Sequence, residues 1–308
     1  MKRGKEDRLR AEIERLKQER KAIILAHNYQ PGEVQDLADY VGDSLGLSQQ
    51  AARTDAEVIV FCGVHFMAET ASILCPEKTV LMPDPTAGCP MADMVDVEGL
   101  QALKREHPQA LVVAYVNTTA AVKAESDLCC TSANAAKVIA SLEPEREIIF
   151  VPDKYLGQYT ASQLGDSRRF VFWNGFCPSH VRILPEHIQQ QRAEHPEALV
   201  MVHPECLPEV TALADEVLST SGMCRVARET TRREVIVGTE TGILHRLRRE
   251  NPDKRFYPAT ELCVCPNMKK NSLEKVLWAL QEMKYEVKVP EEVRVRAWAA
   301  VERMLAVT

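Results

Sequence analysis

The chain has 308 residues, of which 45% are hydrophobic and 27% are charged, and its formal net charge is -6 at pH 7. This composition is typical of a globular protein, and the acidic balance argues against a general partner among nucleic acids or anionic membranes. No stretch approaches the roughly 18 consecutive apolar residues of a membrane-spanning helix, and the first residues are densely charged without an apolar segment. We therefore expect a cytoplasmic protein with no nucleic-acid and no membrane partner.

The first predicted element is a helix over residues 5–20. Leu9, Ile13 and Leu16 fall at helical spacing among charged residues, which is the pattern of an amphipathic helix. We expect this helix to cap the first domain and to lead into the first strand.

Short apolar runs then alternate with helical segments along the rest of the chain. The first set of strands is predicted at 22–26, 40–42, 58–61 and 79–82, with helices at 32–40, from Ser44 onward, at 65–75 and at 97–106. The scheme recurs with strands at 111–115, 128–131, 147–151 and 169–173, and again at 199–203, 216–219, 234–238 and 255–259. Apolar runs of this kind between helices indicate parallel strands that are covered on both faces.

The elements recur because the chain contains three copies of one unit, spaced 88 residues apart. The fold class is therefore α/β, with three repeated domains, each with a small parallel four-stranded sheet, around a pseudo-threefold axis. The expected domains are 1–108, 109–196 and 197–289. A last amphipathic helix within 290–308 is expected to pack back onto the first domain or onto the leading helix.

Polar residues recur with the same spacing at the carboxyl ends of the predicted strands, where ligands bind in open parallel sheets. Three sets stand out: His27, Tyr115 and His203; Tyr29, Asn117 and Glu205; and Ser44, Ser132 and Thr220. We expect the hydroxyls to be helix N-caps, where free N–H groups and the helix dipole favour anions. A single such hydroxyl usually only caps its helix, so the prediction of a phosphate or carboxylate site depends on the shared spacing.

Cysteines also follow the repeat. Cys89, Cys177 and Cys265 are 88 residues apart, and closing three domains into a ring would bring them to one central axis. Three thiolates match three corners of a cubane iron-sulfur cluster and leave the fourth iron open to act as a Lewis acid. Three core thiols would not account for the equal spacing. The other cysteines break the spacing, and Cys263 is the one competitor for a ligand position.

Several segments that carry these residues resemble the quinolinate synthase family. They are His27-Asn28-Tyr29-Gln30, Gly88-Cys89-Pro90-Met91-Ala92, Tyr115-Val116-Asn117-Thr118, Thr131-Ser132-Ala133-Asn134, Gly175-Phe176-Cys177, His203-Pro204-Glu205-Cys206 and Cys265-Pro266-Asn267-Met268-Lys269. The resemblance covers nearly the whole chain. It implies three α/β domains around a 4Fe-4S cluster held by three cysteines.

The resemblance also implies an activity. Iminoaspartate would condense with dihydroxyacetone phosphate, with loss of phosphate and two waters, to give quinolinate for NAD biosynthesis. Functional coupling to an L-aspartate oxidase is implied as well.

Site roles follow from the resemblance and from the chemistry. Condensation, isomerisation and dehydration need proton transfers, for which Tyr29, Glu205 and His203 are suitably placed, and the resemblance makes Tyr29 and Glu205 the acid/base pair. The substrate-binding residues would be His27, Ser44, Tyr115, Asn117, Ser132, His203, Glu205, Ser219 and Thr220. His180 follows Cys177 by three residues and is expected to line the same cavity.

Two alternatives remain open from the sequence. The cysteines could hold a cluster in a sensor or electron carrier without turnover, although such a protein needs no anion cavity. A phosphosugar isomerase or aldolase without metal is the other alternative, and it requires a colourless protein that is active after anaerobic purification.

Overall fold

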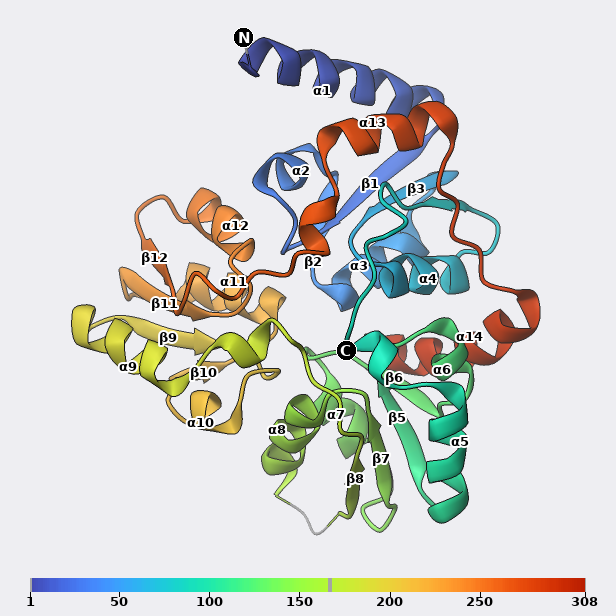
Figure 1. The fold of residues 1–308 in the computed structure, drawn as a ribbon, viewed down its shortest axis with the longest axis vertical. Coiled ribbons are helices and arrows are strands. Elements are labelled where there is room, and N and C mark those ends of the chain that lie inside the picture. Colours follow the sequence, from blue (N-terminus) through green and yellow to red (C-terminus); the bar gives the residue numbers. More distant parts are fainter. Residues whose placement is uncertain (1, 166–167, 308) are drawn as a thin grey trace.

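Three α/β units surround a common centre in the computed structural model, which describes residues 2–165 and 168–307 (Figure 1). Within these residues there are three sheets, each with four parallel strands. The fold class predicted from the sequence is thereby confirmed. Residue 1 of the expected first domain and residue 308 of the expected last helical segment lie outside the described part of the chain. No helix in that part is both long and apolar enough to cross a membrane.

The three sheets share one strand order, in which the first and third strands of each unit lie at the centre. The first sheet has the order β2-β1-β3-β4, with β1 Ala22–His27, β2 Tyr40–Gly42, β3 Val58–Cys62 and β4 Thr79–Leu81. The second has the order β6-β5-β7-β8, with β5 Leu111–Tyr115, β6 Leu128–Cys130, β7 Ile148–Val151 and β8 Phe170–Phe172. The third has the order β10-β9-β11-β12, with β9 Leu199–Val202, β10 Glu216–Val217, β11 Glu234–Gly238 and β12 Arg255–Pro258. The sequence located every one of these strands.

Helices separate the strands in all three units. The first unit contains α2 Gly32–Leu37, α3 Ser44–Arg53 and α4 His65–Leu74. The second contains α6 Ala120–Ala124, α7 Ala135–Ala140 and α8 Lys154–Leu164. The third contains α10 Pro208–Thr211, α11 Thr220–Glu229 and α12 Ile243–Glu250.

An aspartate fixes the second strand against the first in each unit. Asp39, Asp127 and Asp215 are 88 residues apart, and each carboxylate accepts a hydrogen bond of 2.8 Å from a backbone N–H of its unit's first strand. Ile24, Val112 and Val200 are the donors. The triplication therefore extends to single hydrogen bonds, a feature that the sequence analysis did not identify.

The helix after each cysteine loop packs on the next unit. These helices are α5 Val97–Glu106, α9 Pro185–Glu194 and α13 Leu273–Glu282, again 88 residues apart. α5 contacts α6, α9 contacts β11, and α13 contacts both β3 and the leading helix α1 Lys2–Glu19. Figure 1 shows α13 lying beside α1. The expected domain ranges end after these helices, so each range includes one helix that packs on the following unit.

Helix α1 and α13 together cover one face of the first sheet. Ile13 and Leu16 of α1 pack with Val276 and Leu280 of α13 in a buried cluster that also includes Ile24 of β1. Ile13, Ile24, Val276 and Leu280 are all completely buried. The first unit is therefore completed by a helix from the far end of the chain.

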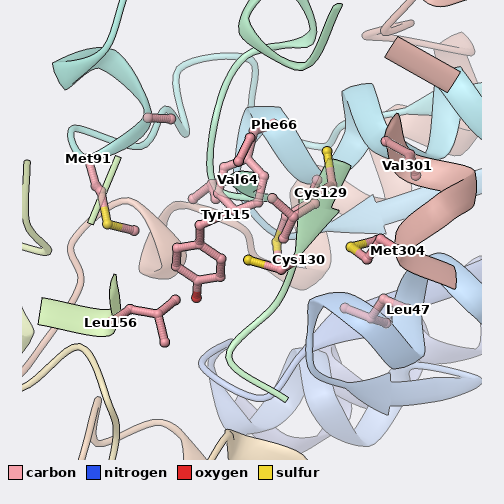
Figure 2. Close-up of a cluster of buried hydrophobic side chains, with 14 of the residues drawn as sticks. Leu47, Val64, Phe66, Met91, Tyr115, Cys129, Cys130, Leu156, Val301 and Met304 are labelled. Carbon is pink, nitrogen blue, oxygen red and sulfur yellow. The ribbon is translucent and has the colours of Figure 1, made fainter. Parts of the chain in front are cut away.

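The last helix, α14 Glu291–Ala306, contacts the first unit, as the sequence suggested, but packs mainly on the second. It contacts α4 of the first unit, but it lies mainly against α6 and β6 of the second unit. Figure 2 shows Val301 and Met304 of α14 in the same apolar cluster as Leu47, Cys129 and Cys130. The sequence indicated an apolar stripe of Val293, Trp298, Val301 and Leu305, but Trp298 is exposed and the buried residues of α14 are Ala297, Ala300, Val301 and Met304. No sequence pattern indicated which unit would receive this helix.

We expect Asn134→Ala to destabilise the protein because Asn134 ties the end of α14 to the second unit. Its Nδ2 donates to the carbonyl oxygens of Met304, at 3.1 Å, and Val307, at 2.9 Å, while its Oδ1 accepts from the N–H of Thr131. Loss of buried partners of this kind costs about 1–3 kcal/mol of unfolding free energy, measurable by urea denaturation. Ser141→Ala, which removes one hydroxyl at the end of α7, is the control. Equal stability of the two variants would contradict the role of Asn134.

Candidate active site

One cavity lies where the carboxyl ends of the strands from all three units converge. Its volume is about 70 Å³, and a buried water needs roughly 10–15 Å³ on the same kind of measure, so the cavity can hold a small ligand. The residues expected from the sequence that line it are His27, Tyr29, Ser44, Cys89, Tyr115, Asn117, Ser132, Cys177, His180, His203, Glu205, Thr220 and Cys265. Residues from three distant parts of the chain therefore face one space.

Ser219 is the one expected site residue, among those the structure describes, that is not part of this lining. Its Oγ accepts a hydrogen bond of 3.2 Å from the N–H of Gly222, so Ser219 is the N-cap of α11. Thr220 is the first helical residue instead. In the same way, Asp43 caps α3 ahead of Ser44, and Ser132 precedes Asn134, the N-cap position of α7. The expectation that Ser44, Ser132 and Thr220 are themselves N-caps was wrong, although all three residues line the cavity.

The three cysteines of the repeat differ from the others in exposure. Among the ten cysteines, all of which the structure describes, Cys89, Cys177 and Cys265 are partly exposed and the rest are buried. Cys263 is completely buried in the apolar core of the third unit and does not line the cavity. This geometry favours Cys265 over Cys263 as a ligand.

Each of the three thiols meets backbone N–H groups at the start of a short 3₁₀ helix. These helices, Ala92–Met94, His180–Arg182 and Met268–Lys270, begin three residues after the cysteines. Burial raises the pKa of Cys89 to about 12, while the N–H of Ala92 acts in the opposite direction and the nearby Cys265 raises it further. Burial likewise raises the pKa of Cys177, and Cys89 adds to this effect. As thiolates, Cys177 and Cys265 would therefore each be repelled by Cys89, and a bound cation would relieve that repulsion.

A second group of donor atoms has the geometry of a single metal site. In the described part of the chain, Cys177, His180 and Glu205 place one donor atom each within 4.8 Å of one another.

Glu205 is the centre of a buried hydrogen-bond network. His180 Nδ1 is 2.8 Å from Glu205 Oε2, and the Tyr115 hydroxyl donates to Oε1 at 2.5 Å. Burial alone would raise the pKa of Glu205, but the imidazole of His180 and the hydrogen bonds from His180 and Tyr115 outweigh it and hold this pKa below the usual range. Glu205 is therefore an ionised carboxylate at neutral pH.

The neighbouring groups are held neutral. Burial lowers the pKa of both His27 and His203 to about 3, and the two imidazoles are uncharged at neutral pH. Burial, reinforced by the charge of Glu205, raises the pKa of Tyr29 and Tyr115 well above the ordinary value. The two phenols therefore remain protonated donors. Such a division into one base and several neutral donors suits proton transfer.

Two residues that the sequence analysis missed support this network. Thr239 Oγ1 is 2.6 Å from the Tyr29 hydroxyl and 2.8 Å from His180 Nε2. Glu240 lines the cavity, pairs with Lys269 at 2.8 Å and accepts from the N–H of Cys265 at 3.1 Å. Both residues follow β11 directly, and their place at a strand end was the only available signal.

Asn117 presents an unused acceptor to the cavity. Its Oδ1 is buried and, within the described residues, has no hydrogen-bond partner. A buried polar atom without a partner is costly, so this oxygen is suited to accept a hydrogen bond from a ligand or from an ordered water.

The neutral state of His27 gives a testable pH dependence. Because the pKa is about 3 in the folded protein and about 6.5 in the unfolded chain, the unfolded state binds more protons below pH ~6.5. The contribution of His27 to stability is therefore complete above that pH and falls by up to ~1.4 kcal/mol per pH unit as the pH decreases. We expect the unfolding free energy of His27→Gln to decrease less steeply between pH 6.5 and 5 than that of the wild type. Identical slopes in urea denaturation would contradict a neutral His27.

Comparisons with known proteins agree with this geometry. Residues 11–306 match the family model described as quinolinate synthetase A protein. A protein named quinolinate synthase from Dehalococcoides mccartyi (strain CBDB1) is 59% identical, over 96% of this chain and 97% of its own. Proteins of the same name from Geobacter metallireducens and Methanosarcina barkeri are 58% and 54% identical, over 98% and 96% of this chain and the same shares of their own.

Proposed function

Because the chain belongs to the quinolinate synthase family, we propose that it condenses iminoaspartate with dihydroxyacetone phosphate to give quinolinate, phosphate and two waters. The observation that carries the proposal is the central cavity, to which each unit contributes one thiol and which surrounds the ionised Glu205. Functional coupling to an L-aspartate oxidase, as the source of iminoaspartate, belongs to the same proposal.

We propose that Cys89, Cys177 and Cys265 hold a 4Fe-4S cluster. Three observations support the fit: the thiols share one cavity, they are the partly exposed cysteines, and backbone N–H groups lie at their sulfurs. When bound, the cluster would supply one iron without a protein ligand, which can act as a Lewis acid on a substrate oxygen.

The side chains of the cavity would bind and orient the two anionic substrates. Ser44, Ser132 and Thr220 line the cavity and carry hydroxyls, and the free Oδ1 of Asn117 can accept a hydrogen bond from a substrate hydroxyl or imine N–H. The neutral imidazoles of His27 and His203 add hydrogen-bonding groups without competing for protons at neutral pH. Enclosure of these groups keeps bulk water from the reacting atoms.

Proton transfer would be divided between Glu205 and Tyr29. The ionised Glu205 is placed to take a proton from a substrate carbon or nitrogen, and His180 and Tyr115 hold its two oxygens in position. Tyr29 keeps its proton because of burial, and Thr239 orients its hydroxyl for donation to a leaving oxygen. The two groups together supply the base and the acid that condensation and dehydration require.

One anaerobic preparation tests the proposal. The purified protein would be analysed for iron and acid-labile sulfide and then supplied with dihydroxyacetone phosphate and freshly generated iminoaspartate. We expect both elements to be present and quinolinate to form. A protein with a cluster but without turnover, and whose visible spectrum does not respond to dicarboxylates, would support a sensor or electron carrier instead. An active but colourless protein would support a metal-free isomerase or aldolase.

A further inference from the structure

Asn28 connects the first unit to a cavity residue of the third unit. It follows His27 at the end of β1, is completely buried, and is not among the cavity-lining residues. Its Nδ2 is 2.8 Å from Oγ1 of Thr220, the first residue of α11, and Thr220 lines the cavity. The side chain of Asn28 is therefore connected to the cavity through the Thr220 hydroxyl.

Arg246 of α12 determines which residue donates in the hydrogen bond between Asn28 and Thr220. Its guanidinium donates to Asn28 Oδ1 at 2.9 Å and to the carbonyl oxygen of Val41 at 2.6 Å, and its Nε donates to Glu250 at 2.6 Å. A guanidinium cannot accept a hydrogen bond, so the amide oxygen of Asn28 must face Arg246 and the amide nitrogen must face Thr220. Thr220 Oγ1 is consequently the acceptor, and its own proton remains available for another partner.

The proton of the Thr220 hydroxyl lies at a helix N-terminus, which attracts anions. Thr220 begins a helix of ten residues, and the free N–H groups and dipole at a helix N-terminus attract negative charge. Because the Thr220 hydroxyl already accepts from Asn28, it is left to donate. An anion at this helix N-terminus would therefore gain a hydrogen bond in addition to the electrostatic attraction.

The two equivalent hydroxyls lack this support. Positions 88 and 176 residues after Asn28 are Val116 and Pro204, whose side chains offer no hydrogen-bond donor. Ser132 faces His203 Nε2 instead, at 3.2 Å. Thr220 is thus distinguished from Ser44 and Ser132 by a relay that the other two interfaces cannot form.

We propose that Asn28, held by Arg246, is a positioning residue that keeps the Thr220 hydroxyl as a donor to an anionic oxygen of the bound substrate or product. The oxygen belongs to a carboxylate or a phosphate. This inference rests on the proposed function, because it takes the ligands of the cavity to be those of quinolinate synthesis.

A double-mutant cycle tests the relay on cluster-loaded protein purified anaerobically. Quinolinate binding would be measured by calorimetry, and kcat and KM for dihydroxyacetone phosphate by turnover, for Asn28→Ala, Thr220→Val and the double variant. Hydrogen bonds to charged groups are worth enough that Thr220→Val should weaken binding about 10- to 100-fold, and Asn28→Ala about 3- to 10-fold. The double variant should bind no more weakly than Thr220→Val, because Asn28 acts only through Thr220.

The two ligands identify the group that Thr220 binds. A raised Kd for quinolinate assigns a carboxylate, whereas a raised KM for dihydroxyacetone phosphate with unchanged quinolinate binding assigns the phosphate. In either case kcat should change less than the binding constant, as expected for an interaction present in both ground and transition states. Thr220→Ser keeps the donor and should restore binding.

Two further variants separate positioning from folding. Asn28→Asp has the same shape but offers only acceptors, so the Thr220 hydroxyl would turn toward the new carboxylate and binding should weaken at least as much as in Thr220→Val. Asn251→Ala is the matched control, since this buried asparagine donates only to the carbonyl oxygen of Leu247 at the end of α12. It should lower the unfolding temperature and leave the quinolinate Kd unchanged.

Additive effects in the double variant, or wild-type binding by both Asn28→Ala and Asn28→Asp, would overturn the relay and leave the proposed function intact. A wild-type protein that neither forms nor binds quinolinate would overturn the proposed function and the relay together.

Discussion

Replacing Cys89, Cys177 or Cys265 by alanine is expected to remove the bound iron and sulfide and to abolish quinolinate formation. Each of these thiols is the single contribution of one unit to the shared cavity, so the other two units have no spare ligand in that position. Cys263→Ala should retain both cluster and activity, because this side chain is completely buried in the core of the third unit. Iron and sulfide analysis, the visible absorbance of the cluster and a turnover assay measure these outcomes.

Cys263→Ala also serves as the matched control for Cys265→Ala, since the two residues are separated by a single position. Loss of the cluster in Cys263→Ala with retention in Cys265→Ala would reverse the ligand assignment. Retention of a full cluster in all four variants would refute a three-cysteine site altogether.

Glu205→Gln is expected to fold, to keep its cluster and to lose most of its activity. The amide has nearly the same shape as the carboxylate but cannot accept a proton, and loss of a general base typically costs about 10²- to 10⁴-fold in kcat. The network around it can adjust, because the Tyr115 hydroxyl can still donate to the amide oxygen. Turnover with measured kcat and KM, alongside iron content and the unfolding temperature, separates the catalytic loss from a structural one.

The matched control for Glu205→Gln is Glu209→Gln, an exposed glutamate on α10 of the same unit. It should have wild-type kcat, KM and iron content. Wild-type turnover by Glu205→Gln would remove Glu205 from the proton-transfer steps, and loss of its cluster would show instead that the carboxylate supports the metal site.

The strands and the central cavity were predictable because their signals are local or periodic. β3, Val58–Cys62, is a continuous apolar run and is buried at every residue. A short run of this kind between helices predicts a strand that is covered on both faces. The 88-residue repeat indicates that equivalent strand ends lie together, and residues such as His27 and Cys265 do share one cavity.

Contacts that break the repeat could not be predicted in this way. Thr239 and Glu240 have Val151 and Pro152 as their equivalents in the second unit, so no periodic signal identified them. The relay from Arg246 through Asn28 to Thr220 crosses between units, and its partners are determined only by tertiary packing. Helix α14 illustrates the same limit, since an apolar stripe predicts that one face of the helix is buried but does not indicate the unit on which that face packs.

The position of α13 determines when the first unit can finish folding. The ribosome releases β1 early, but Val276 and Leu280, which cover that sheet together with α1, are synthesised only near the end of the chain. Contacts between residues so distant in sequence are slow to form because a long loop must close first. During translation, the apolar face of the first sheet therefore stays partly uncovered until the last repeated helix arrives, and that nascent surface is where we expect chaperone dependence and aggregation to concentrate.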